Sequence, residues 1–398
     1  LLDERMDAGL AGTSTVVGRT ERLALPAAVL VNGSMSHALD YDDVVKAMRG
    51  HPSAPVMPVA LGLGAHMHLS GRDSLTAFVA GFETESRVGA LCAHNHYARG
   101  FHPTATVGTF GAAAAAGRLL GLDTARMTLA LGAAGTQAAG LKASFGTHCK
   151  PLHAGRAAEA GLLAARLSAR GFTAHADILG NEQGFAKTQS DGFDLVAALA
   201  DPAGGFHVTN TLFKYHAACF LTHSSIEALN LLRKQHRVTL TDVAAVELHV
   251  NPGHLKICGI AAPTTGLEIK FSLPMMAAMT LAGVDTANDA SYTDLLASRP
   301  DLVSLRNKVR VVSDWAGEAS GAEVVLTLMD GQRLAQTFDV GVPMQDLDQQ
   351  WAMLETKFHS LVEPRLGGPR TAQLIASCRQ AEQIADIGAL LDLTTPGF

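Results

Sequence analysis

The sequence lacks the short motifs that mark most nucleotide-dependent and serine-dependent enzymes. Its 398 residues contain no GxGxxG, no GxxxxGKS/T, no GxSxG and no protein-kinase signature. These motifs wrap backbone amides around a phosphate or expose a reactive hydroxyl group on a sharp turn. Nothing in the sequence therefore supports a nucleotide cofactor or a serine nucleophile.

Cysteine is also scarce, and positive charge is not in excess. The five cysteines show no CxxC spacing, namely Cys92, Cys149, Cys219, Cys258 and Cys378. An odd, dispersed set is typical of reduced thiols in a cytosolic protein rather than of a disulfide framework. The net charge of −6 argues against a nucleic-acid partner or an acidic membrane surface, so any positive potential must be local.

Long apolar runs are absent as well. None reaches the roughly 18 residues that a membrane helix needs, and no signal peptide is visible. We therefore expect no membrane partner and a cytoplasmic location. Because the sequence begins at Leu1-Leu2, inside what looks like an element of secondary structure, we expect a preceding segment that would carry any targeting peptide.

What the first half does contain is helical periodicity. Apolar residues recur at helical spacing in 26–40, 54–68, 73–93, 105–120, 126–143 and 152–169. Ala and Gly are abundant there, as in residues 111–117, and helix propensity explains the Ala but not the Gly. Since small side chains let helices approach closely, we expect a tight helical core.

The pattern changes after residues 201–205, a Pro- and Gly-containing break typical of a domain boundary. A predicted helix at 222–236 is followed by apolar alternation at 246–250 and 308–312, which is strand periodicity. Residues 322–329 and 332–339 flank Asp330-Gly331, a strong hairpin signal. Helical periodicity then returns at 346–360 and 370–393.

These changes predict a mainly α protein with a smaller α+β domain. The helical domain would be discontinuous, formed by residues 1–205 and 344–398. The α+β domain, residues 206–343, would be inserted as a lid.

Three dipeptides place a basic residue directly before a proline: His51-Pro52, His102-Pro103 and Lys150-Pro151. Each proline begins a predicted helix, where its missing N–H costs nothing. The basic side chain then lies beside free N–H groups and the positive end of the helix dipole, a place that attracts anions. If the three helix ends converge, they form a pocket for a di- or tricarboxylate. The alternatives are chance, such as a histidine that bonds its own turn, and junctions on different faces.

An acidic segment, residues 37–43, precedes the first junction. Asp40 and Asp43 are three residues apart and would share one face of a helix. Asp40 is thus a candidate acid/base group or an orienting partner for His51, and the alternative is a solvated helix end. His94-Asn95-His96 and the aspartates could ligate a metal, but no HExxH or EF-hand spacing supports one, so no metal site is predicted.

A fourth cluster, residues 213–223, follows the predicted boundary. Lys214 could bind a substrate carboxylate as the lid closes, and Thr222 could cap the next helix. Cys219 could carry a proton, although a lone cysteine is more often a small core residue.

At these residues the chain resembles the MmgE/PrpD family, which contains 2-methylcitrate dehydratase, cis-aconitate decarboxylase and iminodisuccinate epimerase. The matching segments are 32–43, 50–53, 101–104 with 107–108, 147–155 and 214–223. The resemblance spans nearly the whole chain. It implies a helical domain with a smaller α+β lid, no cofactor, a small carboxylate substrate and a homodimer.

The resemblance also implies site residues. Asp40, His51, His102, Lys150 and Lys214 fall on active-site positions, with Cys219 as a further catalytic candidate and Lys150, Lys214, Thr104 and His153 as substrate-binding candidates. The decarboxylase branch has histidine at the position of Cys219 and tyrosine at the position aligned with Met275, and Ala217 replaces a common proline. Losing the tyrosine hydroxyl argues against cis-aconitate decarboxylation.

The leading hypothesis is a hydro-lyase like 2-methylcitrate dehydratase, which abstracts a proton α to a carboxylate and then expels a β-hydroxyl. Lys150 and Lys214 would stabilise the enolate-like state, and His102 or His51 would transfer the proton. An epimerase using a histidine and Cys219, a non-catalytic carboxylate-binding protein and a metal-dependent hydrolase stay open as alternatives.

Overall fold

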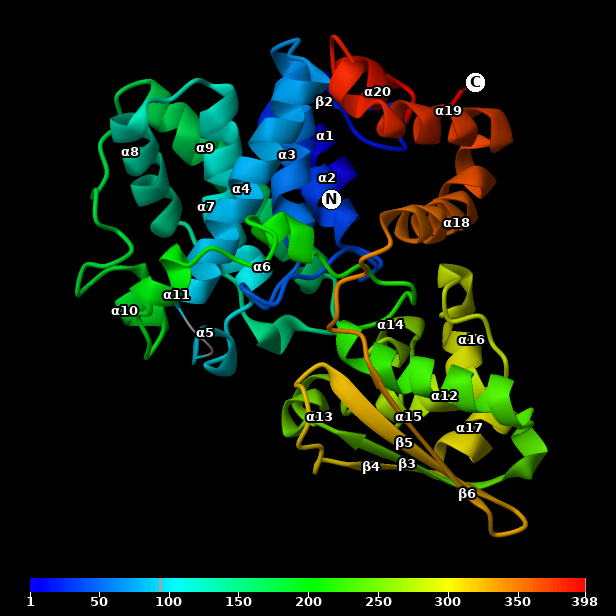
Figure 1. Ribbon diagram of the computed structural model, residues 1–398. Coiled ribbons are helices and arrows are strands. Elements are labelled where there is room, and N and C mark those ends of the chain that lie inside the picture. The colour runs from blue at the N-terminus through cyan, green and yellow to red at the C-terminus, as the bar shows by residue number, and fades with distance from the viewer. Residues whose placement is uncertain (93–94, 398) are drawn as a thin grey trace.

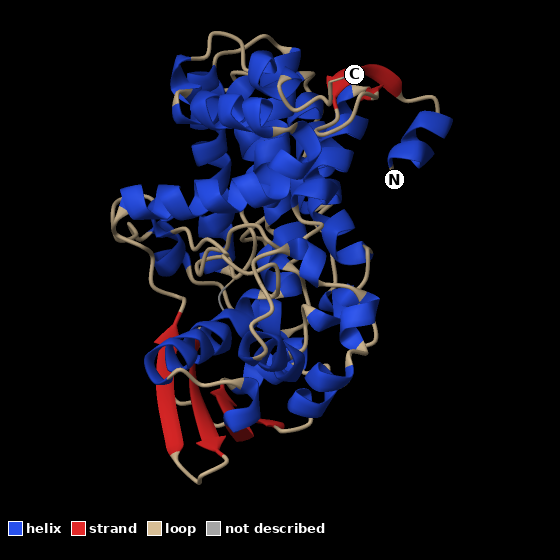
Figure 2. Ribbon diagram, turned by 90° about the vertical axis from the view of Figure 1, so that its right-hand side faces the viewer, coloured by secondary structure: helices blue, strands red, loops and turns tan. Residues whose placement is uncertain are grey.

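The computed structural model describes residues 1–92 and 95–397 (Figure 1). The chain is mostly helical, with a small four-stranded sheet. Helices around both chain ends form the upper part of the view, and the sheet with its own helices forms the lower part. Figure 2 shows the same division from the side, with the larger sheet at the end farthest from both termini. The predicted combination of a mainly α protein with a smaller α+β part is confirmed.

The N-terminal part consists of helices and one small sheet. Its helices are α1 (Leu2–Asp7), α2 (Leu25–Ser36), α3 (Ser53–His66), α4 (Gly71–Leu91), α5 (Asn95–Ala98), α6 (Pro103–Thr106), α7 (Gly108–Leu119), α8 (Thr124–Gly135), α9 (Cys149–Ala169), α10 (Phe185–Gln189) and α11 (Leu195–Leu199). The pairing of β1 (Ala11–Thr15) with β2 (Arg22–Leu23) escapes sequence analysis because a two-residue strand shows no periodicity. Among the described residues, no helix is both long and apolar enough to span a membrane.

Glycine allows the central helices to touch, as the composition predicts. A Cβ atom added to Gly33 of α2 would lie 2.8 Å from the Cα atom of Gly155 in α9. A Cβ atom on Gly155 would in turn meet the carbonyl oxygen of Leu30 and the hydroxyl of Ser34. Since α9 carries Lys150 in its first turn, this close packing fixes where that lysine can reach.

The α+β part is built on the sheet order β4-β3-β5-β6. Its strands are β3 (Val243–Val250), β4 (Val309–Val312), β5 (Gly321–Leu328) and β6 (Arg333–Asp339), and its helices are α12 (His223–His236), α13 (Pro252–Cys258), α14 (Gly266–Ile269), α15 (Leu273–Leu281), α16 (Asp294–Ala297) and α17 (Pro300–Arg306). β5 and β6 form the predicted hairpin, and Gly331 at its tip has a φ of +88°. Helices α12, α15 and α17 lie on one side of the sheet (Figure 1).

The C-terminal segment leaves the sheet and returns to the helical part. It forms α18 (Leu347–Leu366), α19 (Gly368–Arg379) and α20 (Gly388–Asp392), so the helical pattern at 370–393 is two helices rather than one. The Gly71 N–H donates to the carbonyl of Ile384 at 2.8 Å, and the Ile387 N–H donates to that of Leu69 at 2.9 Å. Both chain ends therefore contribute to one helical body.

The close approach of α2 and α9 gives a first prediction. We expect Gly155→Ala to lower the free energy of unfolding by about 1–3 kcal/mol, because the added methyl group meets backbone atoms that cannot move aside independently. Urea denaturation followed by circular dichroism measures the change. The control is Gly368→Ala, whose new methyl group would meet only the flexible Glu363 side chain at 3.2 Å. Equal stability of the two variants would contradict the packing argument.

Candidate active site

The three basic-proline junctions differ in local structure. Pro103 is the first residue of α6, and Pro52 directly precedes α3. Pro151 is the third residue of α9, so Lys150 lies inside the first helical turn rather than before it. The expectation that every proline begins a helix is therefore wrong for Pro151. The side chain of Lys150 nevertheless extends from the N-terminal end of its helix, as predicted.

Lys150 and His51 reach the carboxylate of Asp40, and His102 lies beside His51. Lys150 Nζ lies 2.7 Å from Asp40 Oδ1, and His51 Nε2 lies 3.9 Å from the same oxygen. The ring of His102 lies 6.4 Å from that of His51, centre to centre. These side chains belong to different helix starts, so the alternative of three unrelated faces is excluded.

Lys214 completes the arrangement from the other side. Its Nζ atom lies 2.6 Å from Asp40 Oδ1 and also donates to the Asp40 carbonyl oxygen at 2.7 Å. Asp40 thus bridges two ammonium groups that are both buried. Burial alone would raise the pKa of Asp40, but Lys150 and Lys214 outweigh it and hold that pKa well below its usual value. Burial likewise opposes the charge on Lys214, and Asp40 and Asp42 raise its pKa above the usual value.

The segment that carries Asp40 is a turn, not the helix that the spacing predicts. α2 ends at Ser36, and Asp40 adopts a left-handed conformation with φ of 52°. Asp40 and Asp43 therefore do not share a helix face. Asp43 instead accepts hydrogen bonds from the N–H and hydroxyl of Ser53 at 3.2 and 2.7 Å, at the start of α3.

Three lysines bind consecutive carbonyl groups of this turn. Lys270 donates to Leu39 at 2.8 Å, Lys214 to Asp40 at 2.7 Å and Lys357 to Tyr41 at 2.6 Å. Lys214 and Lys270 come from the segment that builds the α+β part, and Lys357 comes from α18. We call residues 39–41 the lysine-bound turn. A left-handed aspartate is strained by roughly 1–3 kcal/mol, and these contacts supply the compensation.

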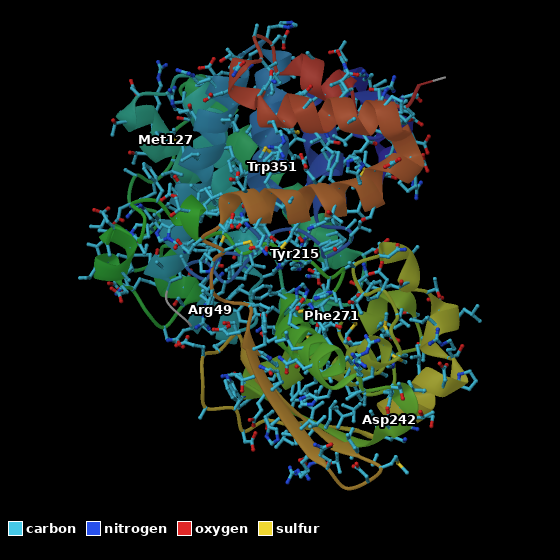
Figure 3. The ribbon with its side chains drawn as sticks, turned by 45° about the vertical axis from the view of Figure 1, so that its right-hand side comes forward. Arg49, Met127, Tyr215, Asp242, Phe271 and Trp351 are labelled. Carbon is cyan, nitrogen blue, oxygen red and sulfur yellow. The ribbon has the colours of Figure 1, made fainter. Side chains whose placement is uncertain are left out.

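Figure 3 shows where these parts meet. Tyr215, next to Lys214 in the chain, lies beneath α18, and Phe271 lies at the top of the α+β part. The Tyr41 hydroxyl donates to the Tyr215 carbonyl at 2.9 Å, and Lys150 Nζ lies 5.1 Å from the centre of the Phe271 ring. The site therefore lies at the junction of the two parts of the molecule.

Asp42, rather than Asp40, makes the closest carboxylate contacts to the histidines of this cluster. Its Oδ2 atom lies 2.8 Å from His37 Nδ1 and 3.3 Å from His51 Nδ1, which also contacts the Asp43 carbonyl at 3.0 Å. Asp40 also lies 3.9 Å from His51 Nε2, so its predicted role as an orienting partner of His51 stays a prediction, with Asp42 as the nearer carboxylate. Burial, assisted by Lys214, lowers the pKa of His51 well below its usual value despite Asp42. His51 is thus uncharged at neutral pH.

His102 is buried and paired with a second histidine. The Nδ1 atoms of His102 and His153 lie 3.1 Å apart, so one ring donates and the other accepts. Burial and the neighbouring His37 and Lys150 lower the pKa of His102 well below its usual value. The Thr104 hydroxyl accepts a hydrogen bond from the His51 backbone N–H at 3.0 Å. Thr104 therefore holds the His51 backbone, and its role in binding substrate stays a prediction.

Cys219 lies beside the cluster and interacts with a second cysteine. A hydrogen bond from Cys258 lowers the pKa of the Cys219 thiol, while burial raises that of Cys258 well above its usual value. The hydroxyl of Thr222 donates to the Cys219 carbonyl at 2.8 Å, so it does not cap α12 and that prediction is wrong. Met275 is fully buried in α15.

The cluster contains buried polar atoms without a hydrogen-bond partner: His37 Nε2, Asp40 Oδ2, Asp42 Oδ1 and His102 Nε2. Ring nitrogens of His37, His51 and His102 lie within 4.8 Å of one another. A buried unpaired polar group costs about 1–3 kcal/mol, and native proteins keep few of them. Four such atoms in one place therefore mark a site for a polar ligand.

The residues suit an anion better than a cation. By distance alone, His37, Asp42 and their neighbours could hold a metal ion. However, two ammonium groups already contact Asp40, and Lys214 Nζ lies 4.0 Å from Asp42. A divalent ion would face both positive charges at short range.

The other suggested metal group gives no more support. Both ring nitrogens of His96 are used, at 3.0 Å from the Gln189 carbonyl and 2.7 Å from the Thr106 hydroxyl. His94 lies outside the described residues.

A cavity of about 380 Å³ lies beside this cluster rather than over it. Its walls come from residues 211–213 and 215–216, α12, the end of β6, the segment that leads into α18 and the first turns of α18. The groups around Asp40 are closed off, since Asp40 is 3% exposed and Lys214 is 0% exposed.

The lysine-bound turn gives a second prediction. Burial lowers the pKa of Lys357 to about 8, yet its ammonium group bonds the carbonyls of Tyr41 and Lys214 at 2.6 and 2.9 Å. We expect Lys357→Met to lower the free energy of unfolding by about 1–3 kcal/mol, because two buried carbonyls lose a charged donor. Thermal unfolding with exposed Lys234→Met as the control measures this, and equal midpoints would contradict it.

Comparison with known proteins identifies the family of the chain. Cis-aconitate decarboxylase of Homo sapiens is 29% identical over 398 residues, which cover 96% of this chain and 82% of the human protein. The enzyme of the same name from Mus musculus is 28% identical, with coverage of 96% and 81%, and that from Aspergillus terreus is 26% identical, with coverage of 96% and 84%. The MmgE/PrpD N-terminal domain model matches residues 5–197, and the C-terminal domain model matches residues 216–381. The chain therefore belongs to the MmgE/PrpD family.

Proposed function

We propose that the chain is a lyase that acts on a small di- or tricarboxylate by moving a proton at the carbon α to a carboxylate. The observation that carries the proposal is the buried cluster in which two lysines and three imidazoles face unpaired polar atoms. The relatives named above are lyases of a tricarboxylate, which supports the substrate class.

In this proposal, substrate carboxylates compete with Asp40 for Lys150 and Lys214. Both ammonium groups contact the same oxygen of Asp40, so an incoming anion can share them without moving the backbone. Negative charge that develops on the substrate carboxylate is then stabilised by groups already in place. In a site closed to water this electrostatic contribution is large.

The histidines supply the proton acceptor. His51 and His102 are uncharged at neutral pH because burial lowers the pKa of each, so either can accept a proton from carbon. After abstraction, the electron pair of the C–H bond forms a double bond as a β-hydroxyl group leaves with a proton as water. This is the dehydratase reaction, and we favour it as the specific activity.

Entry of the substrate requires the α+β part to act as a lid, which is part of the proposal. Lys214 and Lys270 move with that part, whereas Lys150, His51 and His102 belong to the helical part. Closure brings both sets together around Asp40 and removes water from the site. The open state would expose the cluster that is buried here.

Decarboxylation is the second candidate, favoured by the names of the relatives. It would break a carbon–carboxylate bond and place a proton on carbon, and the same lysines and imidazoles could serve it. Against it stand Met275, which is buried and has no hydroxyl group, and Cys219. Epimerisation would use the same carbanion, and a non-catalytic carboxylate-binding role would need only the lysines.

Proton NMR in deuterated water separates these reactions. We expect one of 2-methylcitrate, citrate, cis-aconitate or iminodisuccinate to be converted, with an alkene as the product in the dehydratase case. Release of carbon dioxide would identify a decarboxylase, and deuterium exchange with inversion but no alkene an epimerase. Equal background turnover by wild type and His102→Ala would leave only carboxylate binding.

Lys150 gives a third prediction. We expect Lys150→Met to lower kcat/KM by at least about 100-fold, the usual effect of removing one buried group that stabilises developing charge. Steady-state kinetics with the converted substrate measure it. Lys256→Met, at an exposed position, is the control. A change below threefold in Lys150→Met would remove that lysine from the mechanism.

The fourth prediction concerns pH. The base must be uncharged to accept a proton, and the pKa values of His51 and His102 both lie well below 6.5, mainly through burial. With His51 or His102 as the base, we therefore expect kcat/KM to hold as the pH falls through 6.5 and to decline only at lower pH. A pH–rate profile, with circular dichroism to confirm folding at each pH, tests this. A decline centred at pH 7 or above would contradict it.

A further inference from the structure

We propose that His37 is the proton-abstracting base of this site and that Asp42 is the residue that positions it. The inference rests on the proposed function and deepens it, because sequence analysis assigned the proton transfer to His51 or His102 and gave His37 no role. It is carried by the contacts of the two ring nitrogens of His37.

The position of His37 is fixed by the fold. It directly follows α2, whose close packing on α9 through Gly33 and Gly155 leaves little room for the backbone to shift. The residue is 1% exposed, and its side chain faces the cluster rather than solvent. Its ring centre lies 4.5 Å from that of His51 and 5.7 Å from that of His102.

The first ring nitrogen determines the tautomer. His37 Nδ1 lies 2.8 Å from Asp42 Oδ2. Burial would raise the pKa of Asp42, but His37 and His51 outweigh it and hold that pKa below its usual value, so the carboxylate is ionised. An ionised carboxylate only accepts hydrogen bonds, so Nδ1 must carry the proton. The lone pair of a neutral His37 is therefore on Nε2.

The second ring nitrogen is available. His37 Nε2 is buried and has no hydrogen-bond partner. Unpaired oxygens of Asp40 and Asp42 and the unpaired Nε2 of His102 belong to the same cluster. A substrate held by Lys150 and Lys214 would thus meet a basic nitrogen whose opposite side is bonded to a carboxylate. A carboxylate in this position also stabilises the imidazolium that forms when the base takes a proton.

His96 shows what a structural histidine looks like in the same protein. It is 2% exposed, and both of its nitrogens have partners, the Gln189 carbonyl and the Thr106 hydroxyl. His37 is equally buried but leaves one nitrogen unpaired, at a cost of about 1–3 kcal/mol if nothing binds there. A ligand in the cluster explains why that cost is tolerated.

The other two histidines are held differently. His51 Nδ1 contacts the Asp43 carbonyl at 3.0 Å and lies 3.3 Å from the Asp42 oxygen that His37 contacts at 2.8 Å, and its Nε2 lies 3.9 Å from Asp40. His102 Nδ1 instead contacts His153 Nδ1 at 3.1 Å. His37 is therefore the ring with the shortest carboxylate contact among the three. In the dehydratase reaction the C–H bond breaks, its proton goes to His37 Nε2 and its electron pair forms the alkene. The departing hydroxide takes that proton back, directly or through a neighbouring imidazole, and leaves as water.

The decisive variant is His37→Asn. The asparagine amide can replace the Nδ1–H donor to Asp42 but has no basic nitrogen. We expect kcat to fall by at least about 100-fold, the usual contribution of a general base. Deuterium incorporation at the α carbon should fall in parallel. The dissociation constant of tricarballylate, an unreactive tricarboxylate, and the thermal midpoint should stay close to those of wild type.

Two further variants make the result specific. Asp42→Asn should also lower kcat, because it removes the charge that sets the tautomer of His37, with little change in tricarballylate binding. His96→Asn should lower the thermal midpoint but leave kcat of the folded enzyme near that of wild type. Together they separate a catalytic role from a structural one.

Each outcome bears on one claim. If the wild type turns over a carboxylate and the kcat of His37→Asn stays within threefold of the wild-type value, the role of His37 is overturned and the proposed function stands. Parallel loss of kcat, tricarballylate binding and thermal stability in His37→Asn would assign it a structural role and overturn the inference as well. Absence of wild-type turnover on every carboxylate would overturn the proposed function, and the inference with it.

Discussion

One buried carboxylate connects the parts of this molecule. Asp40 Oδ1 lies 2.7 Å from Lys150, at the start of α9, and 2.6 Å from Lys214, in the segment of the α+β part that leads into α12. Removing one partner from a buried ion pair typically costs about 3–5 kcal/mol, because the remaining charge is left without water or counter-charge. The charges of Asp40, Lys150 and Lys214 therefore hold the helical part and the α+β part together at the site. The same charges are what an anionic ligand would use.

The conformation of the turn follows from this constraint. Asp40 can bridge the lysines only because the chain leaves α2 at Ser36 and passes through a left-handed residue. That conformation is unfavourable in an isolated peptide, and three lysine contacts to consecutive carbonyls compensate for it here. The turn in turn places Asp42 against His37 and His51 and Asp43 against the start of α3. The site is thus a consequence of tertiary contacts more than of local propensity.

This explains which features sequence analysis could predict. The hairpin at Asp330-Gly331 and the strand alternation depend on local chemistry, and the structure bears them out. The convergence of His51, His102 and Lys150 is tertiary, and it was predictable only because the same basic-proline pattern occurs three times. The prediction of a helix through Asp40 is wrong. The chain forms a turn there because three lysines stabilise it, and these lysines follow their partners in the sequence by 174, 231 and 316 positions. His37 and Asp42 lie in the segment that resembles the family. Their separation of five residues does not predict a contact, because only the turn between them brings the two side chains together. Lys270 and Lys357 have no local signal.

The lysine-bound turn also constrains how the protein is made. During synthesis the turn leaves the ribosome early, whereas its last partner, Lys357, follows 316 residues behind Tyr41. At a translation rate of roughly 5–20 residues per second, Lys357 is synthesised on the order of 15–60 seconds after the turn. Over this interval Lys150, Lys214 and Lys270 are made in turn, and the Tyr41 carbonyl is the last of the three turn carbonyls to gain its lysine donor. The lysine-bound turn therefore gains its full set of lysine contacts only after α18 has been synthesised.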